Sequence, residues 1–169
     1  QPVCDLQHDQ PRVVGVEALL RWRHDGQLIA PQEFIPALEE SGQIIAVGDW
    51  VLLQACQQSQ RWQASQPGMS CAVNLSSRQL SEAQFAQRVA QILQLTGLPA
   101  SSLILEITES QLMEDSAQTL ACLRELASLG VRLALDDFGN GYSSLGYLAR
   151  FPLHILKVDE SFIGGSDAE

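Results

Sequence analysis

Four apolar, strand-like segments of the chain each carry an acidic or amide residue where a hydrophobic side chain would be expected. These residues are Glu17, Asn74, Glu106 and the adjacent pair Asp136 and Asp137. A buried carboxylate is costly unless it is paired with a cation or bound to a metal. Oxygen donors on separate strands therefore indicate strands that converge on a shared cation. Because the donors are oxygens, a hard ion, Mg²⁺ or Mn²⁺, is favoured over zinc.

Each of these residues also has a simpler interpretation. Taken singly, any of the carboxylates could be salt-bridged or hydrogen-bonded within a core, and Lys157, in a later strand-like segment, could be a surface lysine. Arg21 could form a surface ion pair, and Glu109 could be a charge favoured at a helix N-terminus. The occurrence of all the donors together with Asp137 and Lys157 in one short chain favours a functional site.

Length and composition are those of one globular domain. The chain has 169 residues, enough to bury a core, and a net charge of −10, which disfavours unspecific binding to DNA or RNA. The four cysteines are far apart in the sequence, a spacing that indicates reduced thiols and favours neither a zinc site nor a disulfide framework. No apolar run is long enough to cross a membrane, and the first residues do not form a signal peptide. We therefore expect a cytoplasmic domain without direct membrane insertion.

Strand-like and helical segments alternate along the chain. Strands are predicted at about 1–6, 12–20, 69–76, 103–108, 131–137 and 154–159. Helices are predicted from near Pro31, over 43–63, over 81–97 with Ser81 as its cap, and over 116–129. This alternation favours an α/β fold, either a β/α barrel or an open doubly wound sheet. In both, the site lies at the carboxyl ends of the strands.

A series of motifs gives the chain a strong resemblance to one family. The motifs are Gln1-Pro2-Val3, Glu17-Ala18-Leu19-Leu20-Arg21-Trp22, Pro31-Gln32-Glu33-Phe34-Ile35-Pro36, Val73-Asn74-Leu75-Ser76, Glu106-Ile107-Thr108-Glu109-Ser110, the run from Asp136 to Leu145, and Leu156-Lys157-Val158-Asp159. In this order and spacing they resemble the EAL-domain family of cyclic-di-GMP phosphodiesterases. The resemblance implies a modified TIM barrel. It also implies metal-dependent hydrolysis of cyclic-di-GMP, a bacterial second messenger, to linear pGpG.

The resemblance also implies roles for individual residues. Glu17, Asn74, Glu106 and Asp136 match the metal ligands, and Asp137 matches a residue that serves a second metal. Lys157 matches a lysine near the attacking water, and Glu109 matches a glutamate that holds the loop after Asp137. Gln1, Arg21 and Asp159 match substrate contacts. Two Mg²⁺ or Mn²⁺ ions roughly 3.5–4 Å apart would activate a water and polarise the phosphoryl group.

The sequence departs from the family pattern in two ways. Asn140 stands where the family usually has Thr, a mild change in a turn. Residues 1–169 also cover only about two-thirds of a barrel domain, without the family's last strands, so we expect a truncated barrel and doubtful activity for the chain alone. The alternative function is a catalytically inactive receptor or regulatory domain that binds cyclic-di-GMP. The resemblance also predicts sensory or regulatory domains in the parent protein, and homodimerisation and a membrane tether are two further hypotheses.

The backbone after Asp136 has to turn sharply if both aspartates are to serve one site. Adjacent residues of a strand point to opposite faces of the sheet. We therefore expect the glycine-rich turn with Gly139 and Gly141 to bring the Asp137 carboxylate back towards the site.

Overall fold

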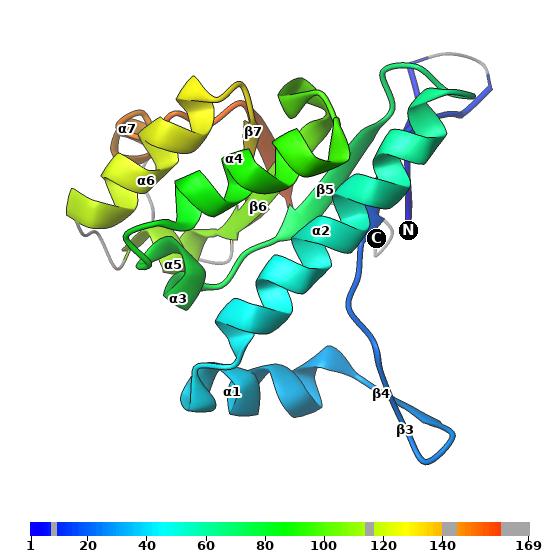
Figure 1. The fold of residues 1–169 in the computed structure, drawn as a ribbon. Coiled ribbons are helices and arrows are strands. Elements are labelled where there is room, and N and C mark those ends of the chain that lie inside the picture. The colour runs from blue at the N-terminus through cyan, green and yellow to red at the C-terminus, as the bar shows by residue number, and fades with distance from the viewer. Residues whose placement is uncertain (8–9, 114–116, 140–144, 160–169) are drawn as a thin grey trace, which may run out of the picture.

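A curled, six-stranded sheet forms the body of the protein, with helices on one face (Figure 1). The computed structural model describes residues 1–7, 10–113, 117–139 and 145–159. The strand order is β1-β2-β5-β6-β7-β8, in which β1 runs antiparallel to β2 and the other neighbours are parallel. The strands are β1 (Pro2–Asp5), β2 (Arg12–Ala18), β5 (Ser70–Asn74), β6 (Leu103–Thr108), β7 (Arg132–Phe138) and β8 (Ile155–Val158). All six predicted strands are present, and the sheet has the shape of a half-barrel.

The helices form the second layer. Between the parallel strands lie α2 (Ile44–Gln63), α4 (Phe85–Thr96) and α6 (Ala117–Ser128), which cover the convex face of the sheet in Figure 1. Shorter elements are α1 (Pro31–Ser41), α3 (Ser77–Leu80), a 3₁₀ turn (Ala100–Ser102), α5 (Glu109–Met113) and α7 (Leu145–Leu148). Parallel strands joined by helices form the α/β fold that the alternating pattern predicted.

The two faces of the sheet pack against different hydrophobic clusters, because successive side chains of a strand point to opposite faces. The main core lies between sheet and helices and includes Val73, Leu105, Leu133 and Leu135, each at most 1% exposed. The other face, which would line a barrel, carries only a small apolar cluster of Ala72, Ile104, Ala134 and Ile155. Polar residues follow this cluster towards the carboxyl ends of the strands. The half-barrel therefore has an apolar floor and a polar upper layer.

A small hairpin interrupts the alternation of strand and helix. Strands β3 (Trp22–His24) and β4 (Gln27–Ile29) pair antiparallel around Asp25 and Gly26, which have φ angles of 48° and 79°. Two successive positive φ angles are typical of the type I′ turn, for which Asp-Gly is a preferred sequence. The sequence prediction missed this hairpin, although the Asp25-Gly26 pair was visible.

The helix predicted from Ser81 begins later than expected. The structure starts α4 at Phe85, and Ser81 lies at the end of α3, where its hydroxyl donates to the carbonyl of Ser77 (2.9 Å). Ser76 acts as the cap instead. Its hydroxyl accepts from the Gln79 amide, and the Gln79 side chain accepts from the Ser76 amide. This reciprocal capping box makes the short α3 a separate element.

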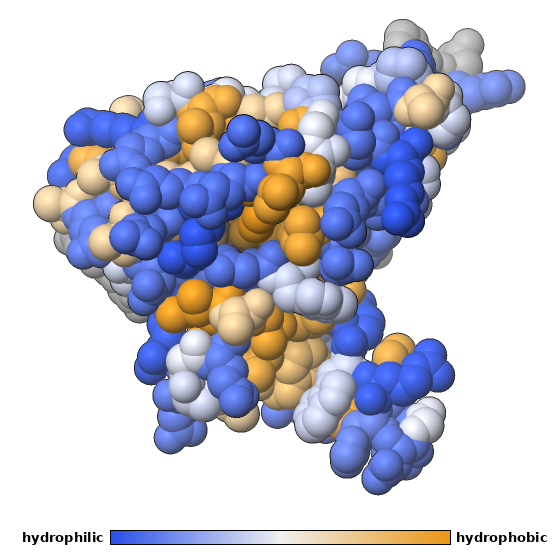
Figure 2. Space-filling model, in the orientation of Figure 1, coloured by the Kyte–Doolittle hydropathy of each residue, from blue (hydrophilic) through white to orange (hydrophobic). Residues whose placement is uncertain are grey.

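The surface of the described residues has two notable features. Among the described helices, none combines the length and apolar character that are needed to cross a bilayer. Figure 2, in the same orientation as Figure 1, shows a mostly hydrophilic helical face with hydrophobic side chains gathered near α1 and the beginning of α2. A groove of about 540 Å³ at this place is lined by Leu20, Trp22, Phe34, Leu38, Val47, Trp50 and neighbours.

Candidate active site at the carboxyl ends of the strands

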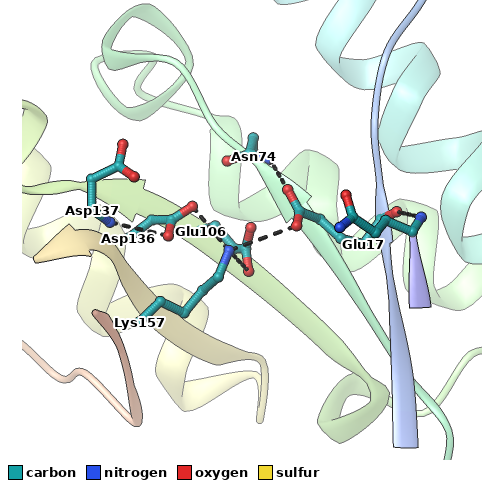
Figure 3. A network of polar contacts seen from close by, with 7 residues as sticks. Glu17, Asn74, Glu106, Asp136, Asp137 and Lys157 are labelled. Carbon is teal, nitrogen blue, oxygen red and sulfur yellow. Dashed lines mark hydrogen bonds and ion pairs between the residues drawn. The ribbon is translucent and has the colours of Figure 1, made fainter. Parts of the chain in front are cut away.

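The ammonium group of Lys157 is the centre of a polar network at the carboxyl ends of the strands (Figure 3). Its Nζ lies 2.9 Å from Glu106 Oε1, 2.9 Å from Asp136 Oδ2 and 3.8 Å from Glu17 Oε2. Asn74 extends the network, since its Nδ2 donates to Glu17 Oε1 at 2.9 Å. Five of the predicted site residues, from five strands, thus form one connected cluster.

Strand register explains why residues so distant in sequence meet. Asn74 of β5 lies opposite Glu106 of β6, and the next inward residue of β6, Thr108, lies opposite Asp136 of β7. Glu17 of β2 lies one layer lower, opposite Ala72. Because these residues occupy alternate positions, they point to the same face of the sheet. The curvature of the sheet then turns their side chains towards one another.

Glu106 is the most deeply buried carboxylate of the network, with 3% of its surface exposed. Burial raises its pKa, and the negative charges of Glu17 and Asp136 raise it further, although the hydrogen bond and charge of Lys157 oppose this. Its Oε2 is buried, and no group among the described residues donates a hydrogen bond to it. Within the described part of the chain, one oxygen of this carboxylate therefore has no hydrogen-bond partner in a low-dielectric site.

Lys157 is charged in this environment. Burial lowers its pKa, but hydrogen bonds to Glu106 and Asp136 and the attraction of the two carboxylates outweigh burial, so that the pKa lies above its ordinary value. Three carboxylates contact this single ammonium group. An excess of negative charge therefore remains at the site, and a further cation can be attracted there.

The backbone of β7 already turns at Asp137. Asp137 has a φ of 55°, and the pairing of β7 with β8 shifts between Leu135 and Phe138. This irregularity has the character of a β-bulge. The Asp137 carboxylate is exposed and points away from the Lys157 ammonium in Figure 3. The expected return of its oxygen towards the cluster is not seen. Gly141 lies outside the described residues.

Asp137 nevertheless interacts electrostatically with the neighbouring carboxylates. Burial raises the pKa of Asp137, and the neighbouring charges of Asp136 and Asp159 raise it further. Asp159 follows β8, and its amide donates to the carbonyl of Phe138 (3.3 Å). Asp137 and Asp159 thus form a second group of negative charge beside the Lys157 network.

Glu109 lies beneath the turn after Asp137. It is 6% exposed, and its Oε2 accepts from the amide of Gly139 at 3.4 Å. Gly139 has a φ of 113°, a conformation that glycine adopts at little cost. The contact is consistent with the loop-holding role that the family resemblance implies for Glu109.

The two remaining predicted substrate contacts lie at the margin of the cluster. Gln1 pairs with Glu17 through backbone hydrogen bonds of 2.7 and 2.8 Å, which places it beside the network. Arg21 follows β2, is exposed, and donates from Nη1 to the carbonyl of Leu20 (2.8 Å). The structure does not bring the Arg21 guanidinium into the carboxylate network.

Gln111 is a supporting residue that the sequence analysis missed. Its Nε2 donates to the carbonyl of Leu75, directly after Asn74, and its Oε1 accepts from the amide of Thr108 (2.9 and 3.0 Å). It thereby ties together the ends of β5 and β6, which carry Asn74 and Glu106. The Thr-x-x-Gln spacing from Thr108 to Gln111 is a capping-box pattern and was a usable signal.

The donor set fits a hard divalent cation. The oxygens of Glu17, Glu106 and Asp136 already surround one cation, the ammonium of Lys157, and no group of the described residues donates to the buried Glu106 Oε2. Carboxylates with an amide oxygen are the ligands that Mg²⁺ and Mn²⁺ prefer. As they stand, however, no three acidic, histidine or cysteine side chains of the described residues are arranged to hold a metal ion. The residue types fit, but Lys157 occupies their shared centre.

The chain is similar in sequence to known proteins. MucR of Pseudomonas aeruginosa, named as a bifunctional diguanylate cyclase/cyclic di-GMP phosphodiesterase, is 44% identical over 165 residues, covering 92% of this chain and 24% of that protein. NbdA of the same organism, named as a cyclic di-GMP phosphodiesterase, is 44% identical over 165 residues, covering 96% of this chain and 21% of that protein. The chain thus spans about a quarter or less of the length of these two relatives.

Solved structures confirm the fold. The MucR phosphodiesterase in complex with c-di-GMP matches with a TM-score of 0.87 and 42% identity, covering 94% of this chain and 65% of that one. The FimX EAL domain of Pseudomonas aeruginosa bound to c-di-GMP matches with a TM-score of 0.82 and 25% identity, covering 90% and 61%. The family model described as "EAL domain" matches residues 1–169. With its sequence, fold and relatives in agreement, the chain belongs to the EAL domain family.

Proposed function

We propose that the chain forms the larger part of a cyclic-di-GMP phosphodiesterase domain, which hydrolyses one phosphodiester bond of cyclic-di-GMP to give pGpG. The observation that carries the proposal is the network of Glu17, Asn74, Glu106, Asp136 and Lys157 on five strands. The residues that match the family's metal ligands by resemblance are present in this span, and the contacts of Glu17, Asn74, Glu106 and Asp136 in one network support their common role. The names of MucR and NbdA support the same activity.

The metal-binding part of the proposal uses the oxygen donors. Glu17, Asn74, Glu106 and Asp136 would hold Mg²⁺ or Mn²⁺, and Asp137 would serve a second ion. When bound, such ions polarise the phosphoryl group and make water a better nucleophile. Glu106 is 3% exposed, and its Oε2 accepts from no group of the described residues, so this oxygen is available to bind a cation.

The remaining predicted residues would bind and orient. Lys157, on its flexible stem, can place a positive charge near the scissile phosphate. Gln1 lies beside Glu17 and can donate a hydrogen bond to the substrate. Arg21 is exposed and can turn its guanidinium towards a phosphate, and Asp159 can accept from a base. Glu109 would act as a positioning residue through Gly139.

The cellular setting is part of the proposal. Because relatives such as MucR are much longer than this chain, we infer that the domain is joined to sensory or regulatory domains in its parent protein. Cyclic-di-GMP is an intracellular messenger, which supports a cytoplasmic location, either free or as part of a membrane-tethered sensor. Homodimerisation belongs to the same hypothesis.

Glu17→Ala in the parent protein tests the activity. We expect loss of pGpG release from cyclic-di-GMP with Mg²⁺ or Mn²⁺ by at least about a hundredfold, the scale on which metal-site changes act. Glu125→Gln, an exposed residue of α6 on the far side of the sheet, is the matched control and should be silent. Near-normal turnover by the Glu17→Ala parent would refute the metal assignment.

A receptor function is the competing outcome of the same assay. The FimX EAL domain bound to c-di-GMP shares the fold, and its name mentions binding alone. A parent protein that binds cyclic-di-GMP tightly but releases no pGpG with either metal would favour a receptor over an enzyme.

A further inference from the structure

Lys157 is the only lysine in the 169-residue sequence, and it lies at the centre of the carboxylate network. Its Nζ lies 2.9 Å from an oxygen of Glu106 and of Asp136, and 3.8 Å from an oxygen of Glu17. An ammonium group has three donors and no acceptor, and two of its donors are used in the hydrogen bonds to Glu106 and Asp136. The side chain is 34% exposed, and water can reach it if it moves.

A metal ion and this ammonium group compete for the same oxygens. Magnesium binds carboxylate oxygens at about 2.0–2.1 Å, whereas Lys157 Nζ holds Glu106 Oε1 and Asp136 Oδ2 at 2.9 Å. An ion that used both oxygens would lie close to the ammonium, and the two positive charges would repel each other in a partly buried site. The four-carbon stem of lysine allows the ammonium to swing away.

We propose that Lys157 is the resident counter-ion of the metal-free site, and that a divalent cation binds only by displacing its ammonium group from Glu106 and Asp136. The inference rests on the proposed metal site. In the metal-free protein the lysine holds three carboxylates together that would otherwise repel one another. The same contacts lower the affinity for metal, because each must be broken before the ion binds.

Lys157→Met measures this competition through metal affinity rather than turnover. Titration of the metal-free chain with MgCl₂ in a calorimeter should give a dissociation constant about tenfold lower for the variant, which is about 1.4 kcal/mol. Methionine keeps the length of the side chain without its charge. Arg61→Met removes the positive charge of an exposed residue near the end of α2 and controls for the change in net charge. It should bind Mg²⁺ as the unmodified chain does.

The single lysine also allows the displacement to be observed directly. Selective ¹⁵N and ¹³C labelling of lysine gives one set of side-chain signals, and Mg²⁺ is diamagnetic. We expect the Lys157 signals to move on titration, with the same midpoint as the calorimetric isotherm. This measurement uses the unmodified chain and is independent of whether Lys157→Met folds.

The outcomes separate this inference from the proposed function. Equal or weaker Mg²⁺ affinity in Lys157→Met, or Lys157 signals that stay in place while Mg²⁺ binds, would overturn the displacement alone. If neither protein binds Mg²⁺, both the proposed metal site and the inference are wrong.

Discussion

Replacing Glu106 by glutamine should stabilise the metal-free chain while it removes metal binding. Glu106 is 3% exposed, and its Oε2 is buried without a donor among the described residues. An unsatisfied buried polar group costs roughly 1–3 kcal/mol, and more when it is charged. Glutamine keeps the shape and an acceptor for Lys157, and although its amide group also needs partners, a neutral amide costs less to bury than a carboxylate. Lys157 keeps its contacts with Asp136 and Glu17, so its own charge stays paired.

The expected gain is about 1–2 kcal/mol in the free energy of unfolding, because the weaker contact with Lys157 offsets part of the relief. In a domain of this size about 1 kcal/mol shifts the melting temperature by roughly 2–4 °C. Thermal unfolding followed by circular dichroism in EDTA should therefore place Glu106→Gln above the unmodified chain. Excess MnCl₂ should raise the melting temperature of the unmodified chain and leave that of the variant unchanged.

The pH dependence of the stability difference between Glu106→Gln and the unmodified chain checks whether the variant is indeed the more stable one. The pKa of Glu106 is raised above its ordinary value of 4.5 by burial and by Glu17 and Asp136. A raised acid pKa means that the folded state favours the protonated form, so the ionised group lowers stability as pH rises through that pKa. The advantage of Glu106→Gln should thus be full at neutral pH and vanish below about pH 4.5. A variant that melts several degrees lower at neutral pH would refute this reasoning.

Three further predictions concern thiols, backbone and assembly. In the native chain, Ellman's reagent should modify only the exposed Cys4 rapidly. The other thiols are buried, and burial raises the pKa of Cys56 to about 12 and the pKa values of Cys71 and Cys122 to about 11. Four reactive thiols before unfolding would contradict the core packing of these three cysteines. Asp137→Gly should change the free energy of unfolding by no more than about 1 kcal/mol, because relief of the positive φ offsets the added flexibility of the unfolded chain, but it should reduce turnover of the parent protein. Asp25→Gly, which also replaces a residue at a positive φ, is the control and should leave turnover unchanged. Equal turnover of the two variants would show that Asp137 does not belong to the site. The 169-residue chain alone should self-associate and hydrolyse cyclic-di-GMP at most weakly, because β1 and β8 are edges of the sheet and Val158 is 48% exposed. A stable monomer in light scattering, together with turnover like that of the parent protein, would disprove this.

The positions of the strands along the chain, and which of them carry acidic or amide residues, could be predicted from the sequence. Strand-like runs around Glu17, Asn74, Glu106 and Asp136 are local patterns of apolar residues, and all of them form parallel or antiparallel strands as expected. Local signals also existed for features that were missed, namely the Asp25-Gly26 turn and the capping residues Ser76 and Gln111. These features depend on residues within a few positions of one another, which is why sequence alone determines them.

Only the tertiary structure decided which charged residues of the site form ion pairs and which of them are buried. Lys157 meets Glu106 and Glu17 because the register of the strands and the curl of the sheet place side chains together that are far apart in the chain. The same packing buries Glu106, and a bulge in β7 turns the Asp137 carboxylate away from the cluster. Such outcomes depend on burial and long-range contacts, which have no counterpart in the local pattern of residues.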